Sequence, residues 1–339
     1  MTTHNPQLNT RNPDLWRPSA CLATLHLRAQ ILAQIRAFFA ECAVLEVDTP
    51  VLSCAAGTEL HLQSFTTCYS GPLAPPDGQL YLHTSPEYPM KRLLAAGSGS
   101  IYQICKVFRD GEAGRRHNPE FTLLEWYRTG IDYVCLMAEV EALVKSLLQA
   151  RLSLGETQRV SYREAFLSYA GIDPFTATTA ALTECVRRRD IVTPAGMGQS
   201  ERNFWLDLLM SHVIEPQLGR NSLCFIYDYP KEQASLARIR PGDPAVAERF
   251  ELYVNGVELA NGFNELADSV EQRRRFGHDN EQRLRRGWPV PPIDENLLAA
   301  LEHGLPTCAG VALGIDRLVM LAAAAHSIQE VIAFPVDRA

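Results

Sequence analysis

Residues 101–129 read IYQICKVFRDGEAGRRHNPEFTLLEWYRT. Two runs rich in aromatic and aliphatic residues, 101–108 and 121–127, enclose a polar loop that contains two glycines. Such a pattern predicts two antiparallel strands joined by a loop. Arg109 follows the first strand directly, and a guanidinium held there offers a rigid fork of donors to a phosphate group. A hairpin with an ordinary surface arginine is the alternative interpretation.

Similar short segments recur along the chain without regular helices between them, which favours a mostly antiparallel sheet over a doubly wound parallel one. We expect these further strands within 44–52 and at 79–83, 250–254, 257–260 and 310–315. Apolar residues at helical spacing predict helices, as do the polar run at 269–286 and the segment after the last strand. These helices are expected at 25–42, 133–154, 269–286 (a solvated one) and 316–325.

The predicted class is therefore α+β, and the domain organisation follows from the same pattern. We expect an N-terminal tail over 1–24 and one domain over 25–339. The region of about 135–245 mixes helical and turn signals without a chemical motif, so we interpret it as a helical insertion.

The composition limits the class of protein. The chain has 339 residues, and 32 Lys and Arg stand against 39 Asp and Glu, a formal net charge of -7. This balance argues against a surface built as a whole to hold nucleic acid, while a local basic patch stays compatible with it. Nine cysteines are scattered without a C-x-x-C pair, which predicts reduced thiols. The N-terminus is polar, and Asp316 and Arg317 interrupt the last apolar tract, so we expect a cytoplasmic protein without a membrane span.

Arg317 is a second candidate phosphate ligand. It lies just after a strand that contains Gly310 and Gly314, and glycines let another group approach the backbone closely. A salt bridge with Asp316 at the start of a helix is the alternative.

Glu251 and Glu258 flank the turn Asn255-Gly256 and are therefore expected to meet across a hairpin. Two carboxylates close together repel unless a cation lies between them, and two carboxylates with nucleotide phosphates suit Mg²⁺. Solvated charges at a sheet edge are the alternative.

Three more acids stand in apolar or aromatic surroundings: Glu87, Glu125 and Glu265. Burying a carboxylate is costly unless it is paired. If these acids converge on one pocket, a cationic group such as an amine is the natural ligand. The histidines and cysteines show no ligand spacing, and we assign them to packing or to the surface.

Three segments together resemble motifs 1, 2 and 3 of the class II aminoacyl-tRNA synthetases in order and spacing. They are the helix and strand that end at Pro50, the hairpin of Phe108-Arg109 with the run 117–122, and the run 314–318. The runs His-Asn-Pro-Glu-Phe-Thr and Asn-Gly-Phe-Asn-Glu-Leu, with Glu125 and Tyr127, are similar to the lysyl branch of that class.

Lysyl-tRNA synthetases carry an N-terminal anticodon-binding domain, whereas motif 1 begins here near Leu25 and leaves no room for one. The chain therefore resembles the family of elongation factor P–(R)-β-lysine ligases, paralogues that lack this domain. The runs 84–91, 112–115, 124–128 and 331–334 are closely similar to that family.

The resemblance implies a class II synthetase-like antiparallel sheet flanked by helices, dimeric through motif 1. It implies a ligase that uses ATP and Mg²⁺ to activate (R)-β-lysine as an adenylate and transfers it to a lysine side chain of elongation factor P. No membrane association and no stable tRNA binding are expected. The alternatives are a minimal lysyl-tRNA synthetase-like enzyme or free amino-acid ligase, and a non-catalytic amino-acid-binding regulator.

The resemblance also implies roles for individual residues. Arg109 and Arg317 would act in catalysis on the α- and γ-phosphates, and Glu251 and Glu258 would hold the metal. The residues expected at the nucleotide are Arg109, Asp110, Gly111, Asn118, Glu258, Leu259, Gly314 and Arg317. The residues expected at the amino acid are Ser85, Pro86, Glu87, Glu125, Tyr127, Asn261, Phe263, Glu265 and Ala312.

The sequence departs from the family pattern at two places. Motif 2 has Asp110-Gly111 where the family has Asn-Glu, and Ala312 stands where lysyl-tRNA synthetases tend to have glycine. The Ala312 methyl group would reshape the pocket floor and favour a β-amino acid. Most arginine clusters are expected to be solvated helix faces, whereas Arg115 and Arg116 lie in the motif 2 loop, where they could guide an acidic acceptor protein.

Overall fold

The structure, a computed structural model, describes residues 16–193 and 201–339. Its centre is a nine-stranded sheet in the order β1-β5-β6-β12-β11-β10-β8-β7, with β9 paired to β10. The strands are β1 (Leu45–Glu46), β5 (Ile101–Phe108), β6 (Glu120–Thr129), β7 (Gln158–Ser161), β8 (Leu223–Pro230), β9 (Ile239–Arg240), β10 (Val246–Val254), β11 (Val257–Asn264) and β12 (Cys308–Gly314). Every pairing is antiparallel except β1 with β5 and β7 with β8. The predicted α+β class is confirmed.

The two central hairpins form where the sequence predicts them. Strands β5 and β6 pair from Ile101 opposite Tyr127 to Phe108 opposite Glu120, on either side of the polar loop. Strands β10 and β11 are joined at Asn255 and Gly256, whose φ angles of 49° and 68° are those of a tight hairpin turn.

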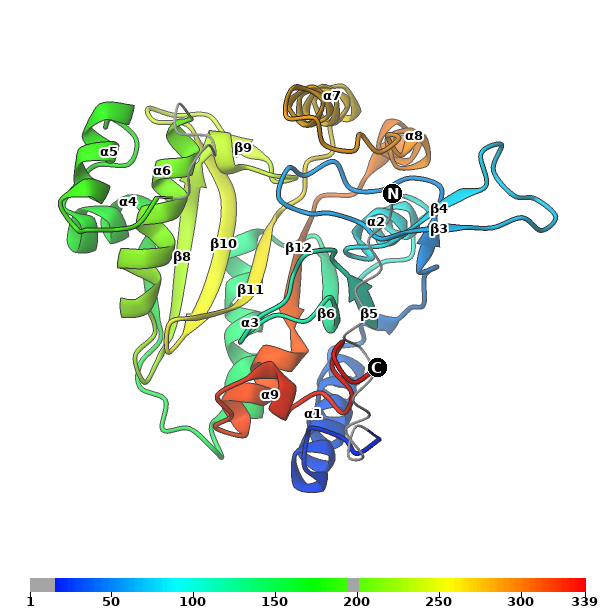
Figure 1. Cartoon of the computed structure of the whole chain (residues 1–339), viewed down its shortest axis with the longest axis horizontal. Coiled ribbons are helices and arrows are strands. Elements are labelled where there is room, and N and C mark those ends of the chain that lie inside the picture. Colours follow the sequence, from blue (N-terminus) through cyan, green and yellow to red (C-terminus); the bar gives the residue numbers. More distant parts are fainter. Residues whose placement is uncertain (1–15, 194–200) are drawn as a thin grey trace, which may run out of the picture.

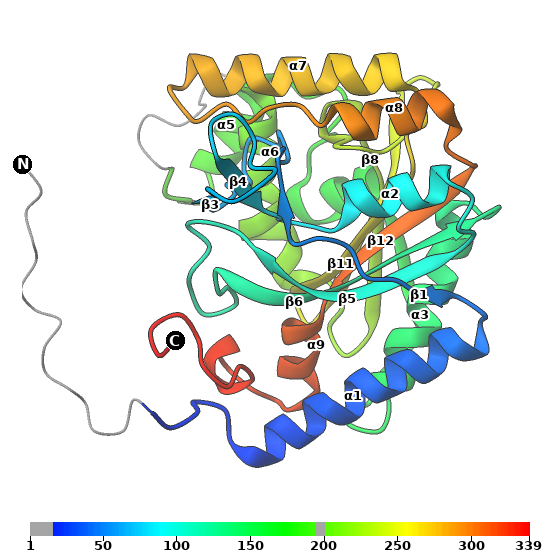
Figure 2. The same cartoon turned by 90° about the vertical axis from the view of Figure 1, so that its right-hand side faces the viewer.

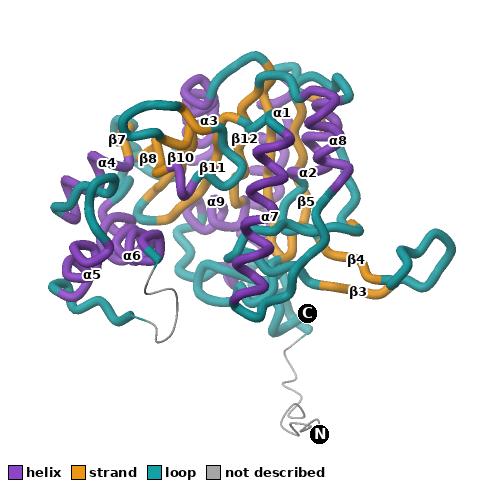
Figure 3. Tube along the Cα trace, turned by 90° about the horizontal axis from the view of Figure 1, so that it is seen from above, coloured by secondary structure: helices purple, strands orange, loops and turns teal. Residues whose placement is uncertain are grey.

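A smaller sheet lies beside the main one and was only partly expected. It pairs β4 (Gln79–Leu82) with β2 (Leu52–Ser53) on one side and with β3 (Thr66–Cys68) on the other. The β3–β4 hairpin projects from the body of the molecule (Figures 1 and 3). The segment between β2 and β3, residues 54–65, returns toward the main sheet and forms part of the site described below.

Three helices cover one face of the sheet. They are α1 (Leu22–Glu41), α3 (Tyr133–Leu148) and α9 (Ile315–Ala322), which lie below the sheet in Figure 2. The periodic apolar residues bury their side chains in one core with the sheet, for example Ile35 of α1, Leu143 of α3 and Leu318 of α9, each fully buried. A buried ion pair of Arg28 with Asp316, at 2.5 Å, joins α1 to the start of α9.

The opposite face is covered by α2 (Glu87–Ala95), α7 (Ser269–Arg285) and α8 (Glu295–Gly304), which lie above the sheet in Figure 2. Met90, Phe276 and Leu297 from these helices pack into a second core. Helix α2 was not predicted, because it has nine residues and includes Pro89, which is tolerated in the first turn of a helix.

The region expected as a helical insertion contains strands as well as helices. Its helical segments are α4 (Tyr162–Ala165), η1 (Phe166–Ala170), α5 (Thr179–Arg187), α6 (Arg202–Leu209), η2 (Met210–Ile214), η3 (Glu215–Gln217) and η4 (Lys231–Gln233). Strands β7 and β8 in the same region join the main sheet, and η5 (Ile328–Glu330) lies near the C-terminus. Within the described ranges, no helix is long and apolar enough to span a membrane.

Candidate active site

Residues from separate motifs meet in one row across the sheet. Gln103 is opposite Glu125, Glu125 is opposite Ala312, Ala312 is opposite Asn261, and Asn261 is opposite Glu251. Residues opposite each other on neighbouring strands present their side chains to the same face. Glu125, Ala312, Asn261 and Glu251 therefore share one face of the sheet, the one that α2, α7 and α8 cover.

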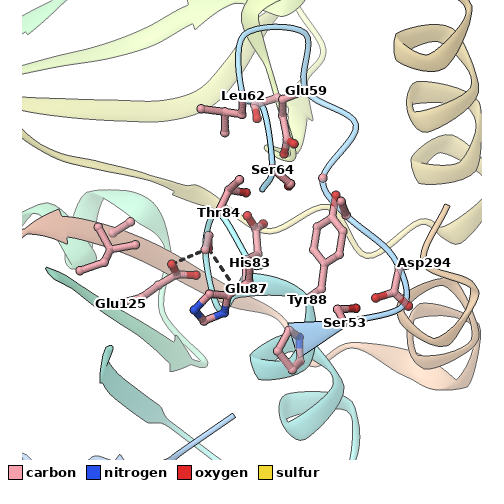
Figure 4. Close-up of a pocket in the computed structure, with 18 of the residues that line it drawn as sticks. Ser53, Glu59, Leu62, Ser64, His83, Thr84, Glu87, Tyr88, Glu125 and Asp294 are labelled. Carbon is pink, nitrogen blue, oxygen red and sulfur yellow. Dashed lines mark hydrogen bonds between the residues drawn. The ribbon is translucent and has the colours of Figure 1, made fainter. Parts of the chain in front are cut away.

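A cavity of about 220 Å³ lies between this face, helix α2 and the loop of residues 54–65. Figure 4 shows how side chains of the loop and of α2 converge on it. Nine predicted residues line the cavity: Ser85, Glu87, Arg109, Glu125, Tyr127, Asn261, Phe263, Glu265 and Ala312. Pro86 is not in the lining and instead precedes the first residue of α2.

The acids of the cavity already have a protein cation among them, which the sequence did not indicate. Lys91 of α2 is buried, and its Nζ lies 2.6 Å from Glu87 Oε1 and 2.5 Å from Glu265 Oε2. Burial would lower the pKa of Lys91, but the carboxylates of Glu265 and Glu87 outweigh this and raise it. Lys91 therefore stays charged and holds these two carboxylates in place.

Glu125 is held from two sides at the bottom of the cavity. Ser85 Oγ donates to its Oε2 at 2.7 Å, and the Tyr127 hydroxyl donates to its Oε1 at 2.6 Å. Burial and then the charge of Glu87 raise the pKa of Glu125 to about 7. A cationic ligand would favour the ionised form of this carboxylate.

Gly310 makes room for the same acidic cluster. A β-carbon at this position would lie 2.4 Å from the Tyr127 ring and 2.5 Å from Glu265 Oε1. Glu265 Oε1 is buried and has no hydrogen-bond partner among the described residues. Because the side chain of Glu265 is only 1% exposed, this free oxygen is available only to a group inside the cavity.

Arg109 lines the cavity directly after the end of β5, at the position that the sequence predicts. Its Nε donates to the Thr84 carbonyl at 3.3 Å, and its guanidinium stacks over Phe121 with 5.0 Å to the ring centroid. The nearest carboxylate is that of Glu112, at 3.6 Å. These contacts hold the guanidinium in place. Its ion pair with Glu112 is long and partly exposed, so N–H donors of Arg109 remain for an anion.

A second group of charged residues surrounds Arg317, in the first turn of α9. Arg317 Nη1 donates to the Glu258 carbonyl at 3.0 Å and lies 3.3 Å from Glu258 Oε2. Its Nη2 is 2.7 Å from His117 Nε2. Burial and then the charge of Arg317 lower the pKa of His117, so a neutral imidazole faces the guanidinium.

One alternative interpretation is wrong at this point. Arg317 does not pair with Asp316, because Asp316 turns away to accept hydrogen bonds from Arg28 and from the Thr122 backbone. His117 is exposed, in keeping with the surface assignment, but its contact with Arg317, which links the motif 2 loop to α9, was not predicted.

Glu251 is enclosed more fully than expected. The hydroxyls of Tyr229 and Tyr253 donate to its Oε2, and Arg249 Nη2 donates to its Oε1 at 2.5 Å. Glu251 lies opposite Asn261 and Glu258 opposite Tyr253, with a bulge between, so the two acids are near each other without being paired across the hairpin. Glu258 presents a side chain that is 39% exposed.

The pKa of a third acid, Glu215, is affected by the charges of this pair. Burial, followed by the charges of Glu251 and Glu258, raises the pKa of Glu215 to about 7. Negative charge therefore accumulates beside Arg317, and hard carboxylate oxygens of this kind are the donors that Mg²⁺ prefers. Glu258 is the open donor of this set, whereas both oxygens of Glu251 already accept hydrogen bonds, and no group of three or more His, Cys, Asp or Glu side chains in the described ranges is arranged to hold a metal ion by itself.

The other residues expected at the nucleotide have diverse positions. The side-chain amide of Asn118 donates to the Glu120 carbonyl and accepts from the Val336 amide, so it joins motif 2 to the C-terminal turn. The Leu259 side chain is buried in the first core, which leaves only its backbone toward the site. Asp110 and Gly111 are exposed in the motif 2 loop, and Gly314 precedes α9.

The loop of residues 54–65 is held in place by hydrogen bonds from Arg283, a residue that no sequence pattern singles out. Arg283 of α7 is 2% exposed and donates to the carbonyls of Thr58, Glu59 and Leu62. Thr58 Oγ1 also donates to Asp279 Oδ2 at 3.0 Å. One arginine of the helix that is predicted as solvated at 269–286 is therefore buried, and its hydrogen bonds hold the loop of residues 54–65 against α7.

The remaining arginine clusters are largely neutralised within the protein. Arg187 and Arg188 pair with Glu184, Arg274 pairs with Glu271, and Arg273 pairs with Glu295. They fit the prediction of solvated helix faces.

Comparison with known proteins agrees with this geometry. Residues 3–338 match the family model described as tRNA synthetases class II (D, K and N). A curated protein of Yersinia enterocolitica named elongation factor P–(R)-β-lysine ligase is 53% identical over 96% of this chain and 98% of its own length. Proteins of the same name from Edwardsiella ictaluri and Yersinia pestis are 51% and 52% identical over 96% and 95% of this chain, each over 98% of its own length.

Proposed function

The chain belongs to the class II tRNA synthetases (D, K and N), and on that premise we propose that it is an elongation factor P–(R)-β-lysine ligase. It is an ATP-dependent ligase that forms an amide bond through an aminoacyl-adenylate. The observation that carries the proposal is the cavity itself, in which Glu87, Glu125 and Glu265 surround a space that Arg109 also lines.

In the first step, a carboxylate oxygen of the amino acid attacks the α-phosphorus of ATP, and pyrophosphate leaves. Arg109 is placed to bind the α-phosphate, where negative charge develops, and Arg317 to bind the γ-phosphate. No protein nucleophile is needed, because positioning and charge stabilisation supply the catalysis. Glu251 and Glu258 would hold Mg²⁺, which neutralises triphosphate charge when bound.

In the second step, the neutral ε-amino group of an acceptor lysine attacks the acyl carbon, AMP leaves, and the amine loses a proton. We expect this lysine to enter on the side of the cavity that Arg109 lines, next to the motif 2 loop. Protein-lysine transfer is favoured over transfer to tRNA by the likeness to the curated ligases along the whole chain. An amino-acid-binding regulator without catalysis is disfavoured, because such a protein would need neither Arg317 nor the acids beside it.

The test is ATP–pyrophosphate exchange in the presence of single amino acids. We expect exchange to be fastest with (R)-β-lysine and slower with α-lysine. Exchange that is equal for lysine and for an uncharged amino acid of similar length would contradict the acidic pocket as the amino-acid site.

Substrate preference gives a first prediction, at Ala312. Its methyl group lies on the site face between Glu125 and Asn261, so it narrows the cavity floor beside the acid that is held by Ser85 and Tyr127. Ala312→Gly is expected to raise kcat/KM for α-lysine relative to (R)-β-lysine by about tenfold, the size of a one-methyl discrimination. Pyrophosphate exchange with both substrates measures the ratio, and an unchanged ratio removes Ala312 from substrate selection.

The motif 2 loop gives a second prediction, about the acceptor. Arg116 Nη1 donates to the Gly256 carbonyl at 2.9 Å, so this residue anchors the loop, whereas Arg115 is exposed and has no side-chain partner among the described residues. Opposite charges across an interface mainly set the encounter rate. Arg115→Glu should slow transfer to elongation factor P about tenfold at low salt and leave adenylate formation unchanged.

The matched control is Arg188→Glu, which reverses an exposed arginine far from the loop in the sequence. Quenched-flow measurement of the two half-reactions separates the outcomes. If Arg115→Glu slows both half-reactions equally, the loop serves ATP and not the acceptor.

A homodimer through motif 1 is also part of the proposal. Leu22 at the start of α1, Leu45 in β1 and Leu52 in β2 are large apolar residues that are 71%, 55% and 45% exposed. Exposed apolar side chains on neighbouring elements are typical of a protein interface. Sedimentation of the protein checks this, and a monomer at micromolar concentration would contradict it.

All nine cysteines are free, which supports a reducing compartment such as the cytoplasm.

A further inference from the structure

A fourth acid, Glu59, enters the cavity from the loop of residues 54–65. Figure 4 shows its side chain directed from the loop toward the side of the cavity that Tyr88 and Glu87 form. Its Oε2 is buried and has no hydrogen-bond partner in the described residues, and the same holds for the hydroxyl of Tyr88. Two buried polar groups from facing elements are therefore left for a ligand, since unpaired buried polar atoms are costly.

The position of Glu59 is fixed by its surroundings. Arg283 binds the carbonyl of Glu59 itself, and the neighbouring Thr58 is tied to Asp279 of α7. A β-carbon at Gly57 would lie 2.4 Å from Glu59 Oε2, so glycine at that position leaves the space that the carboxylate occupies. A loop held in this way presents the carboxylate at one place in the cavity.

Contacts place these acids at two ends of the cavity. The loop that carries Glu59 is joined to the residue after Arg109, because the Asp110 backbone amide donates to the Gln63 carbonyl of that loop at 2.7 Å. Glu265 has another neighbour, since Lys91 Nζ lies 2.5 Å from its Oε2, and the same Nζ lies 2.6 Å from Glu87 Oε1. Burial and then the charge of Glu87 raise the pKa of Glu59 to about 7, which agrees with a position of Glu87 between the two ends.

We propose that Glu59 is a specificity-determining residue that, with Glu87, binds the amino group nearer the carboxylate of a diamino acid. This inference rests on the proposed function, in which Arg109 marks the end of the cavity where the substrate carboxylate meets ATP. Glu125 and Glu265 then bind the terminal amino group. In a β-amino acid the inner amino group is one bond further from the carboxylate than in an α-amino acid, and a carboxylate on a fixed loop can detect that displacement.

Charge balance supports two ammonium groups in this cavity. Five carboxylates line the cavity, those of Glu59, Glu87, Glu125, Glu265 and Asp294, together with the guanidiniums of Arg92 and Arg109. With the ammonium of Lys91, which contacts Glu87 and Glu265, three cations face five carboxylates, a formal excess of two negative charges. A substrate with one amino group would satisfy the far end and leave Glu59 unpaired. A substrate with two would provide a cation at each end.

The test compares (R)-β-lysine with 6-aminohexanoic acid, which has the terminal amino group and lacks the inner one. Glu59→Gln keeps the shape and removes the charge. We expect the KM for (R)-β-lysine in pyrophosphate exchange to rise about 10- to 100-fold, the effect of losing one charged hydrogen bond. The inhibition constant of 6-aminohexanoic acid and the KM for ATP should stay unchanged.

Glu281→Gln is the matched control, because Glu281 is an acid of α7 with a side chain that is 67% exposed. Equal weakening of (R)-β-lysine and 6-aminohexanoic acid by Glu59→Gln would overturn the inference, since it would mean that the substitution disturbs the whole cavity. An unchanged KM for (R)-β-lysine would overturn it too. If the wild-type protein does not activate (R)-β-lysine, it is the proposed function that fails.

Discussion

Arg317→Ala is expected to slow ATP–pyrophosphate exchange with (R)-β-lysine by about 10²–10³-fold, the usual loss when one preorganised donor to a transition-state anion is removed. In the structure, Arg317 is the cation that joins Glu258 to His117, and its side chain is 23% exposed. Arg116 is not expected to replace it, because Arg116 Nη1 donates to the Gly256 carbonyl.

Two further variants sharpen this test. Arg317→Lys keeps the charge and loses the fork of donors, so its activity should fall between those of the wild type and Arg317→Ala. Arg285→Ala removes a helix-surface arginine that is 68% exposed and should leave exchange unchanged. Near-normal exchange in Arg317→Ala would remove this residue from the phosphate site.

Lys91→Met is expected to lower the free energy of unfolding at pH 7.5 by about 3–5 kcal/mol, the cost of breaking a buried ion pair from one side. The substitution leaves Glu87 and Glu265 facing each other without the ammonium that now lies within 2.6 Å of both. Urea unfolding measures the change. Lys106→Met is the control, because Lys106 forms a surface pair with Glu120 and is 44% exposed, so its loss should cost less than about 1 kcal/mol.

The effect of Lys91→Met should depend on pH in a definite direction. Without Lys91, burial and the charge of Glu87 raise the pKa of Glu265 with nothing to oppose them. The folded variant therefore binds a proton that the unfolded chain does not, and stability rises as the pH falls. We expect the deficit relative to wild type to shrink between pH 8 and pH 6. A deficit that grows as the pH falls would contradict a role for Lys91 in holding ionised carboxylates.

The parts of the fold that the sequence predicts are those with strong local signals. Strands β5, β6, β10 and β11 have runs of aromatic and β-branched residues, and Asn255-Gly256 specifies a tight turn between the last two. Helix α2 has no such signal, since nine residues with a proline give too few turns for a period to be read. Strand β8 lies in a region that the sequence predicts as helical. Its apolar run is so short that periodicity alone does not separate a buried strand from a helical segment.

The candidate site likewise contains residues that the sequence predicts and residues that it does not. Arg109, Glu125 and Glu265 could be named because each sits in a recognisable run, and their meeting in one cavity follows from the strand register. Lys91 could not be named in this way, because a lysine four residues after a glutamate in a helix is also typical of an exposed surface ion pair.

Arg283 is a second residue of the site region that could not be singled out from the sequence. It lies in a helix with four other arginines, and only the return of the loop at residues 54–65 makes it the buried member of that set. Such long-range contacts have no local signature, and they place both Lys91 and the loop that carries Glu59.

The central claim is that this chain joins (R)-β-lysine to a lysine of elongation factor P. Mass spectrometry of purified elongation factor P after incubation with the enzyme, ATP, Mg²⁺ and (R)-β-lysine tests it most directly. We predict a gain of one β-lysyl group, located by peptide fragmentation on a single lysine, and no gain when ATP is omitted or Arg317→Ala is used. Unmodified elongation factor P, together with efficient aminoacylation of bulk tRNA by the same preparation, would contradict the account.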